Sequence, residues 1–186
     1  MDGAGPVPPP RREGVRMAKQ TRDEEFTVYV ASRSGWLRKV AYLLCGDWHR
    51  ADDLVQETIT KLYVNWARAS RMENRDGYAR RVLVNTFLAE QRSPWWRRTL
   101  RSEAGPEGVA GDVDLDASLD LRRALAALPP RQRATVVLRY YCDLSIEQAA
   151  ETLGCSSGNV KSQSSRALEA LRGTLAPRPT AAERTP

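Results

Sequence analysis

The stretch LSIEQAAETLGCSSGNVKSQSSRALEALRG, residues 144–173, contains two amphipathic segments separated by a short turn. Ser145 followed by Gln148 predicts a capping box at the start of a first helix, and the glycine of the following LGC predicts its end. Ser156 or Ser157 then caps a second helix, in which apolar residues recur at helical spacing. Two helices joined by so short a turn are typical of a helix-turn-helix.

The second helix of this stretch has an apolar inner face and a polar outer face. Val160 and Ala167 belong to the inner face, whereas Lys161, Ser162 and Arg166 project from the outer one. Hydroxyl and guanidinium groups hydrogen-bond to phosphates and to base edges in a major groove. The pattern therefore predicts duplex DNA binding, and the alternative is an ordinary helical hairpin with a solvated face.

Helical periodicity also extends upstream of this motif. Residues 118–141 carry apolar side chains at helical spacing, interrupted by Pro129-Pro130, and no alternating strand pattern of any length occurs from 24 to 91. The fold class expected is all-α, with two small helical domains joined by a flexible acidic linker. The expected boundaries are a disordered extension at 1–22, a first domain at 23–98, the linker at 99–117, the helix-turn-helix domain at 118–175 and a disordered tail at 176–186.

The first domain is expected to hold three long helices. An apolar stripe from Phe26 to Leu44 predicts the first helix, and Gly46 predicts its end. The second lies within 51–66. The third, from about 77 to 92, is apolar nearly all round its circumference and should therefore be central. Asn85 interrupts it, and a polar amide in such a helix needs a partner, either in a ligand or in the preceding loop.

Composition narrows the function classes. The 186 residues contain 29 Lys and Arg against 23 Asp and Glu, and this formal charge of +6 suits a polyanionic partner or a solvated basic surface. The three cysteines are far apart and form no CxxC, which indicates a reducing compartment. A single histidine cannot supply a two-histidine metal site. We therefore expect no metal site and no cofactor.

Targeting signals are also informative. No apolar run reaches the roughly 18 residues that a membrane span needs, so no membrane association is expected. The N-terminal stretch MDGAGPVPPPRREGVR lacks the apolar core of a secretory signal, and the expected location is cytoplasmic. Met17 is a second candidate for the start of translation, beside Met1.

With both domains placed, the chain resembles the extracytoplasmic-function (ECF) sigma factors, the minimal initiation factors of bacterial RNA polymerase. The resemblance spans about residues 24 to 173 and keeps the family's order. It rests on ADDLVQETITKLYVNW at 51–66, GYARRVLVNTFLAEQRS at 77–93, LPPRQRATVVLRYYCDLSIEQAAETLGCSSGNVKS at 128–162 and SRALEALR at 165–172.

The resemblance implies two DNA-reading sites. The first domain would capture the melted minus-10 element, with Asn85 hydrogen-bonding a flipped base of the non-template strand and nearby arginines covering that base or holding phosphates. Trp95 and Trp96 would stack on unpaired bases or anchor the last turn of the domain. The minus-10 set is Asn85, Arg68, Arg71, Arg75, Arg80, Arg81, Arg92, Arg97 and Arg98. The set for the minus-35 element, in duplex DNA, is Ser157, Asn159, Lys161, Ser162, Gln163, Ser165 and Arg166.

One departure matters here. Many family members carry an arginine where this chain has Gln163, and Ser165 replaces a bulkier residue. The promoter sequence therefore cannot be transferred from relatives.

The resemblance also implies partners. The second helix would dock on the clamp helices of the largest subunit of core RNA polymerase, through Asp52, Asp53, Gln56 and Glu57, although a plain solvated helix face would look the same. The flap region of the polymerase and an anti-sigma factor are further candidate partners. The acidic linker would pass through the polymerase cleft, or would serve solubility alone.

Two other functions compete with this interpretation. The chain could be a helix-turn-helix regulator that binds operator DNA without polymerase, with the first domain as a dimerisation or effector module. An enzyme is the other class. It is not expected, because the carboxylates on the second helix have no histidine, nucleophile or phosphate-binding loop beside them.

Overall fold

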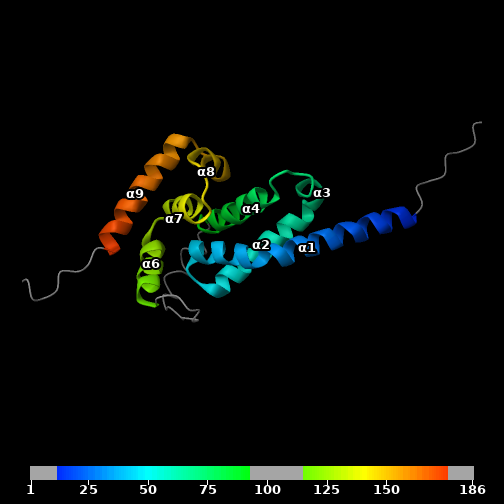
Figure 1. Ribbon diagram of the computed structural model, residues 1–186, viewed down its shortest axis with the longest axis horizontal. Coiled ribbons are helices and arrows are strands. Elements are labelled where there is room, and N and C mark those ends of the chain that lie inside the picture. Colours follow the sequence, from blue (N-terminus) through cyan, green and yellow to red (C-terminus); the bar gives the residue numbers. More distant parts are fainter. Residues whose placement is uncertain (1–11, 93–114, 176–186) are drawn as a thin grey trace, which may run out of the picture.

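The computed structural model describes residues 12–92 and 115–175, and all secondary structure within these ranges is helical (Figure 1). This confirms the expected all-α class. The first domain comprises α1 (Arg12–Cys45), α2 (Trp48–Val64), α3 (Trp66–Ala69) and α4 (Arg75–Glu90). The second comprises α6 (Leu115–Ala127), α7 (Pro130–Val136), the π-helical turn η1 (Val137–Tyr141), α8 (Ile146–Leu153) and α9 (Ser157–Leu175).

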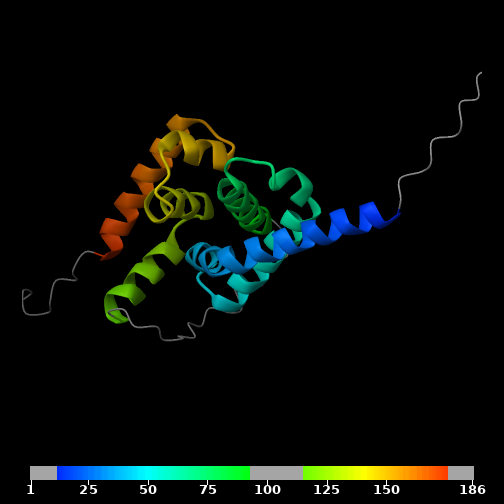
Figure 2. The same ribbon diagram turned by 45° about the vertical axis from the view of Figure 1, so that its right-hand side comes forward.

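Helix α1 is longer than its apolar stripe suggests. It begins at Arg12, well before the expected domain boundary at residue 23, and its first turns project away from the other helices (Figures 1 and 2). Farther along α1, Arg22 donates to the carbonyl of Tyr63 at 2.8 Å and Asp23 accepts from the Tyr63 hydroxyl at 3.0 Å. Residues 12–22, which the sequence assigned to a disordered extension, are helical in the described structure, and Arg22 and Asp23 join α1 to the end of α2.

The turn between α1 and α2 follows from two residues. Gly46 takes a φ of +79°, a left-handed conformation that ends α1 as its position in the sequence predicts. Asp47 then caps α2, because its carboxylate accepts from the backbone N–H of Arg50 at 2.7 Å. Helix α2 starts at Trp48, three positions before the motif that first indicated it.

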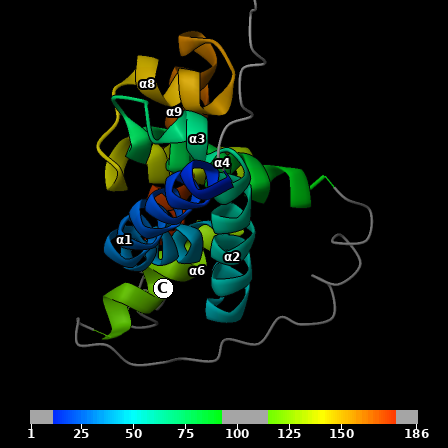
Figure 3. The ribbon, with the colours of Figure 1, turned by 90° about the vertical axis from the view of Figure 1, so that its right-hand side faces the viewer.

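Helix α4 lies at the centre of the molecule, as its apolar circumference predicts. Leu83, Val84 and Phe87 have no exposed surface. The helix contacts α1 and α2 on one side and α7 and α8 on the other, which Figures 1 and 3 show from two directions. A helix packed on several sides can bury a complete ring of apolar side chains.

The second domain contains an irregular turn that the sequence pattern did not predict. Pro130 opens α7, where its missing N–H is not needed, and the helix widens into η1. Two backbone hydrogen bonds close the turn. Cys142 N–H donates to the carbonyl of Val137 at 2.9 Å, and Leu144 N–H donates to the carbonyl of Leu138 at 3.1 Å. Asp143 has a φ of +50°, a conformation that most side chains avoid.

The two domains pack directly against each other. One apolar cluster runs from Phe26 on α1 to Val160 on α9, and it includes side chains of both domains. Arg133 on α7 lies at this junction, donating to the carbonyls of Leu44 at 2.7 Å and Ala126 at 2.6 Å. It thus satisfies carbonyls at the C-terminal ends of α1 and α6. The sequence predicted two domains, but this junction between them was not predicted.

Part of the expected organisation lies outside the described residues. This applies to residues 1–11 of the expected extension, to most of the linker and to the tail. Helix α6 begins at Leu115, so the last positions assigned to the linker are helical. Among the helices of the described part of the chain, none is long and apolar enough to cross a membrane.

Candidate nucleic-acid interface

The helix-turn-helix is built by the local signals that predicted it. The Ser145 hydroxyl accepts from Gln148 N–H at 3.1 Å, and the Gln148 amide accepts from Ser145 N–H at 2.8 Å, so the capping box is complete. Gly154 ends α8 with a φ of +61°. Of the two serines proposed as the next cap, Ser156 is the one that accepts, from Asn159 N–H at 3.2 Å.

The outer face of α9 is open. Val160 and Ala167 are fully buried against the rest of the domain, whereas Lys161, Ser162 and Arg166 are exposed. The predicted set thus lies together on one helix and points to solvent, with Asn159 and Ser165 also exposed and Ser157 and Gln163 half-buried. A helix with this exposed face, held by a second helix across a short turn, has the form that enters a major groove.

Asn85 lies at a shallow pocket of about 290 Å³ between α2 and α4. The side chain is exposed and makes no hydrogen bond to any residue in the described part of the chain. It does not cap the preceding loop, because Asn74 performs that function by accepting from Gly77 N–H at 2.7 Å. The amide of Asn85, with two donors and an acceptor, therefore remains available to a ligand.

Sequence reasoning missed most of the pocket. Lys61 belongs to none of the predicted sets, and its ammonium donates to Thr86 Oγ1 at 3.0 Å and pairs with Glu57 at 2.7 Å. The residues lining the pocket are Lys61, Asn65, Tyr78, Val82, Asn85 and Thr86. Thr86 beside Asn85 in the VNT motif was the one local signal, because a second polar residue in an apolar helix also needs a partner.

The arginines of the predicted minus-10 set differ in placement. Arg80 is half-buried, with its guanidinium carbon 5.4 Å from the centre of the Trp36 ring on α1. The other described arginines of the set are exposed on α3, on the loop after it, on α4 and in the turn that follows α4; they are Arg68, Arg71, Arg75, Arg81 and Arg92. Arg97 and Arg98, with Trp95 and Trp96, lie outside the described residues.

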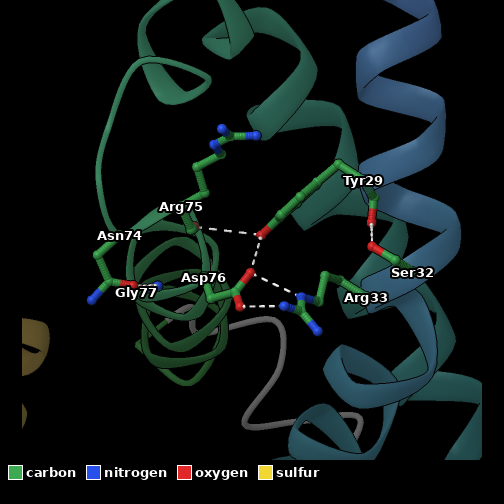
Figure 4. Close-up of polar contacts among 7 residues, drawn as sticks. All are labelled: Tyr29, Ser32, Arg33, Asn74, Arg75, Asp76 and Gly77. Atoms are coloured by element: carbon green, nitrogen blue, oxygen red, sulfur yellow. Dashed lines mark hydrogen bonds and ion pairs between the residues drawn. The ribbon is translucent and has the colours of Figure 1, made fainter.

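The start of α4 is tied to α1 by the polar cluster in Figure 4. Asp76 accepts from the Tyr29 hydroxyl at 3.2 Å and from Arg33 Nε at 3.1 Å, and its second oxygen lies 2.9 Å from Arg33 Nη2. An acidic residue is favourable there because the first turn of a helix carries partial positive charge. A Cβ added to Gly77 would lie 2.6 Å from the Asn74 side chain, so a larger residue there would displace the side chain that caps α4.

The four residues predicted to contact polymerase lie on the outer face of α2. Asp52 pairs with Arg38 through both oxygens, at 2.5 and 2.9 Å, and this hydrogen bonding lowers the pKa of its carboxyl. Glu57 pairs with Lys61. Asp53 and Gln56 are exposed, and among the described residues their side chains have no hydrogen bond or ion pair.

The side chains that could bind a metal ion or act as a nucleophile form no cluster within the described residues. No group of three or more His, Cys, Asp or Glu side chains there is placed to hold a metal ion. The cysteines are half-buried, and burial raises the pKa of the Cys45 thiol to about 11. A thiol in that state is a poor nucleophile at neutral pH.

Comparison with known proteins adds independent findings. Residues 29–97 match the family Sigma-70 region 2, and residues 118–171 match Sigma-70, region 4. The RNA polymerase sigma-E factor of Streptomyces coelicolor is 37% identical over 161 residues, covering 83% of this chain and 88% of the relative. Its counterpart in Streptomyces avermitilis is 36% identical over 158 residues, covering 81% and 85%.

Solved structures of other proteins have a similar fold. The sigma factor RpoE of Bartonella quintana, in complex with the anti-sigma factor NepR, superposes with a TM-score of 0.65 at 29% identity, covering 82% of this chain and 97% of that one. CnrH in complex with the cytosolic domain of CnrY has the same fold, with a TM-score of 0.58 at 21% identity over 85% and 94% of the two chains.

Both domains therefore match sigma factors, in the same order and over most of their length. The helix-turn-helix on α8 and α9 coincides with the second matched region, and the pocket at Asn85 lies in the first. The chain belongs to the extracytoplasmic-function family of RNA polymerase sigma factors.

Proposed function

We propose that the chain binds core RNA polymerase, recognises the minus-35 and minus-10 elements of promoters and promotes DNA melting at the start of transcription. The observation that carries this proposal is that this sigma-factor chain has two separate surfaces suited to binding DNA. One is the exposed face of α9 and the other is the pocket at Asn85.

The minus-35 element is read in duplex form by α9. Lys161 and Arg166 supply positive charge, and Ser162 and Asn159 supply short polar groups that reach base edges or phosphates. Because Gln163 and Ser165 depart from the common family pattern, this face selects a sequence of its own. Ser157, at the first turn of α9, lies where helix N–H groups bind a phosphate.

The minus-10 element is held as a single strand. A base flipped out of the stack enters the pocket, where the Asn85 amide hydrogen-bonds its edge. The ammonium of Lys61 lies at the pocket wall and attracts the adjoining phosphate. The exposed arginines on α3, α4 and the loop between them hold the backbone, with Arg80 joining them once it leaves Trp36. Unpairing costs a few kcal/mol, which these contacts offset together with polymerase.

Both elements cannot be bound while the domains remain packed together. The elements are about 25 base pairs apart, which is roughly 80 Å of duplex at about 3.4 Å per pair. A folded unit of this size has a radius of gyration of only about 15 Å. We infer that the junction around Arg133 opens in the holoenzyme. Spin labels on α2 and α9 should move apart when core polymerase is added, and an unchanged distance would contradict this step.

Core polymerase binds the outer face of α2. Asp53 and Gln56 meet the clamp helices directly, whereas Asp52 and Glu57 exchange their partners Arg38 and Lys61 for basic groups of polymerase. The helix-turn-helix domain meets the flap region. An anti-sigma factor is a further candidate partner, because the superposed RpoE structure contains an anti-sigma factor bound to its sigma factor.

The chain acts by binding and catalyses no reaction itself. We expect it to work in the bacterial cytoplasm, where core polymerase is found. Run-off transcription tests the proposal: core polymerase alone should ignore a cognate promoter, and addition of the chain should give a discrete start site. If the free chain bound operator DNA tightly and polymerase output did not depend on it, the chain would act as a conventional regulator.

A further inference from the structure

The pocket at Asn85 is assembled from both ends of one loop. We call residues 67–76 the capture loop. Asn65 lies just before this loop, Tyr78 lies just after it, and both line the pocket. The width of the pocket therefore depends on how the two ends of the capture loop are held relative to each other.

Tyr29 on α1 contacts both ends. Its ring packs on Trp66, with 5.0 Å between ring centres, and Trp66 is 1% exposed at the upstream end. Its hydroxyl lies 3.2 Å from Asp76 Oδ1 and 3.4 Å from the carbonyl oxygen of Arg75 at the downstream end (Figure 4). In the described structure one side chain thus contacts both ends of the loop, and it does not itself line the pocket.

The hydroxyl of Tyr29 is a donor at all physiological pH values. Burial, and then the negative charge of Asp76, raise the pKa of Tyr29 above its usual value, so the proton stays on the oxygen. The hydroxyl has one proton, and the carboxylate is the stronger acceptor of the two neighbours. Arg33 holds that carboxylate in place through both of its oxygens.

The contacts among Tyr29, Arg33 and Asp76 are better suited to fix the position of the capture loop than to stabilise the fold. The side chains of Arg33 and Asp76 are 47% and 36% exposed, and ion pairs at such positions contribute little to stability. The contacts are nevertheless directional, and base capture needs its polar groups held close to their productive positions.

We propose that Tyr29, through its hydroxyl bond to Asp76, is a positioning residue that braces the capture loop and sets the base selectivity of the pocket. This inference rests on the proposed function of that pocket. Tyr29 touches no DNA itself; it acts through the placement of Asn65 and Tyr78 on either side of the captured base.

Selection from a random promoter pool tests the brace. Holoenzyme made from the full chain and core polymerase transcribes templates randomised upstream of the start site, and sequenced transcripts report the preference at each promoter position. Tyr29→Phe keeps the ring on Trp66 and removes only the hydroxyl. Preference for the captured minus-10 base should fall about threefold to tenfold, the range expected for one hydrogen bond, while minus-35 preference stays unchanged.

The chain offers a matched control. Tyr63 also donates its hydroxyl to an aspartate, Asp23 at 3.0 Å, but it does not line the pocket. Tyr63→Phe should leave both preferences as in the wild type. Asp76→Ala removes the acceptor of the same hydrogen bond and should reproduce the effect of Tyr29→Phe.

The outcomes separate the brace from the proposed function. A wild-type profile from both Tyr29→Phe and Asp76→Ala would overturn the brace. An equal loss at both promoter elements, with less holoenzyme formed, would show a structural role and overturn it too. If the wild-type chain itself selected no elements, the proposed function would fail, and the brace with it.

Discussion

The two regions of this protein that we propose contact DNA are built in different ways. The face of α9 belongs to one helix, and the signals that place it lie within residues 144–173. The pocket at Asn85 draws Lys61 and Asn65 from the α2 segment and Tyr78 and Thr86 from α4. The first region is a local motif held by caps and a turn, whereas the second exists only when distant helices pack. A motif of the first kind can be read from sequence, but a composite pocket needs the tertiary structure.

The largest effect is expected when the side chain of Asn85 is removed from the pocket. Asn85→Ala should reduce open-complex formation about tenfold to a hundredfold, because an amide paired with a base edge contributes about 1–3 kcal/mol. Permanganate footprinting of the melted strand measures the change. Holoenzyme assembly should persist, and if assembly fails instead, Asn85 has a structural role.

The corresponding change on the local motif is Arg166→Ala. We expect about a fivefold to tenfold loss of transcription from promoters with a matching upstream element, since one base or phosphate contact disappears. Arg172→Ala is a matched control, because Arg172 is exposed on the same helix in its last turn. Binding titrations on cognate and unrelated duplexes compare them. An equal loss on both duplexes would assign Arg166 to phosphate only.

A third substitution tests whether the helix-turn-helix depends on the capping box at the start of α8. Ser145→Ala removes the capping box of α8 and should lower the free energy of unfolding by about 1 kcal/mol. Thr174→Ala is the control, since that hydroxyl bonds only to the carbonyl of Ala170 within α9. Urea denaturation followed by circular dichroism measures both. Equal midpoints for the two variants would mean that tertiary packing, not the cap, sets the start of α8.

The smallest expected effect concerns the turn before the motif. Asp143 has a φ of +50°, so Asp143→Gly should relieve strain and raise the free energy of unfolding by about 0.5 kcal/mol. Asp120→Gly, within helix α6, should do the opposite and lower it by about 0.3–0.5 kcal/mol, the difference between the helix propensities of Asp and Gly. A loss of stability in Asp143→Gly, measured in the same urea series, would mean that the Asp143 side chain contributes to the turn.

Much of the fold followed from short-range patterns. The apolar stripe of α1, the glycines that end α1 and α8, and the capping box at Ser145 were all predicted and are present. Helix ends were less well placed: α1 starts at Arg12, and no local signal indicated the contacts that Arg22 and Asp23 make with Tyr63.

The polar site residues divide in the same way. Lys161, Ser162 and Arg166 were placed by helical period alone, and they are exposed together on α9. Arg80 was grouped with the other arginines, yet it rests over the Trp36 ring and is half-buried. Its neighbour Arg81 is exposed, and only the packing of α4 distinguishes these two adjacent residues.

The sequence by itself therefore determined the all-α class, the helix-turn-helix and the identity of Asn85 as an unusual polar residue. Helical period and capping act within a few residues, so their effects can be read along the chain. The tertiary structure alone decided that Lys61 and Thr86 meet beside Asn85, that Tyr29 reaches Asp76, and that Arg133 joins the two domains. Each of these contacts joins residues far apart in the chain, and their meeting depends on how whole helices pack.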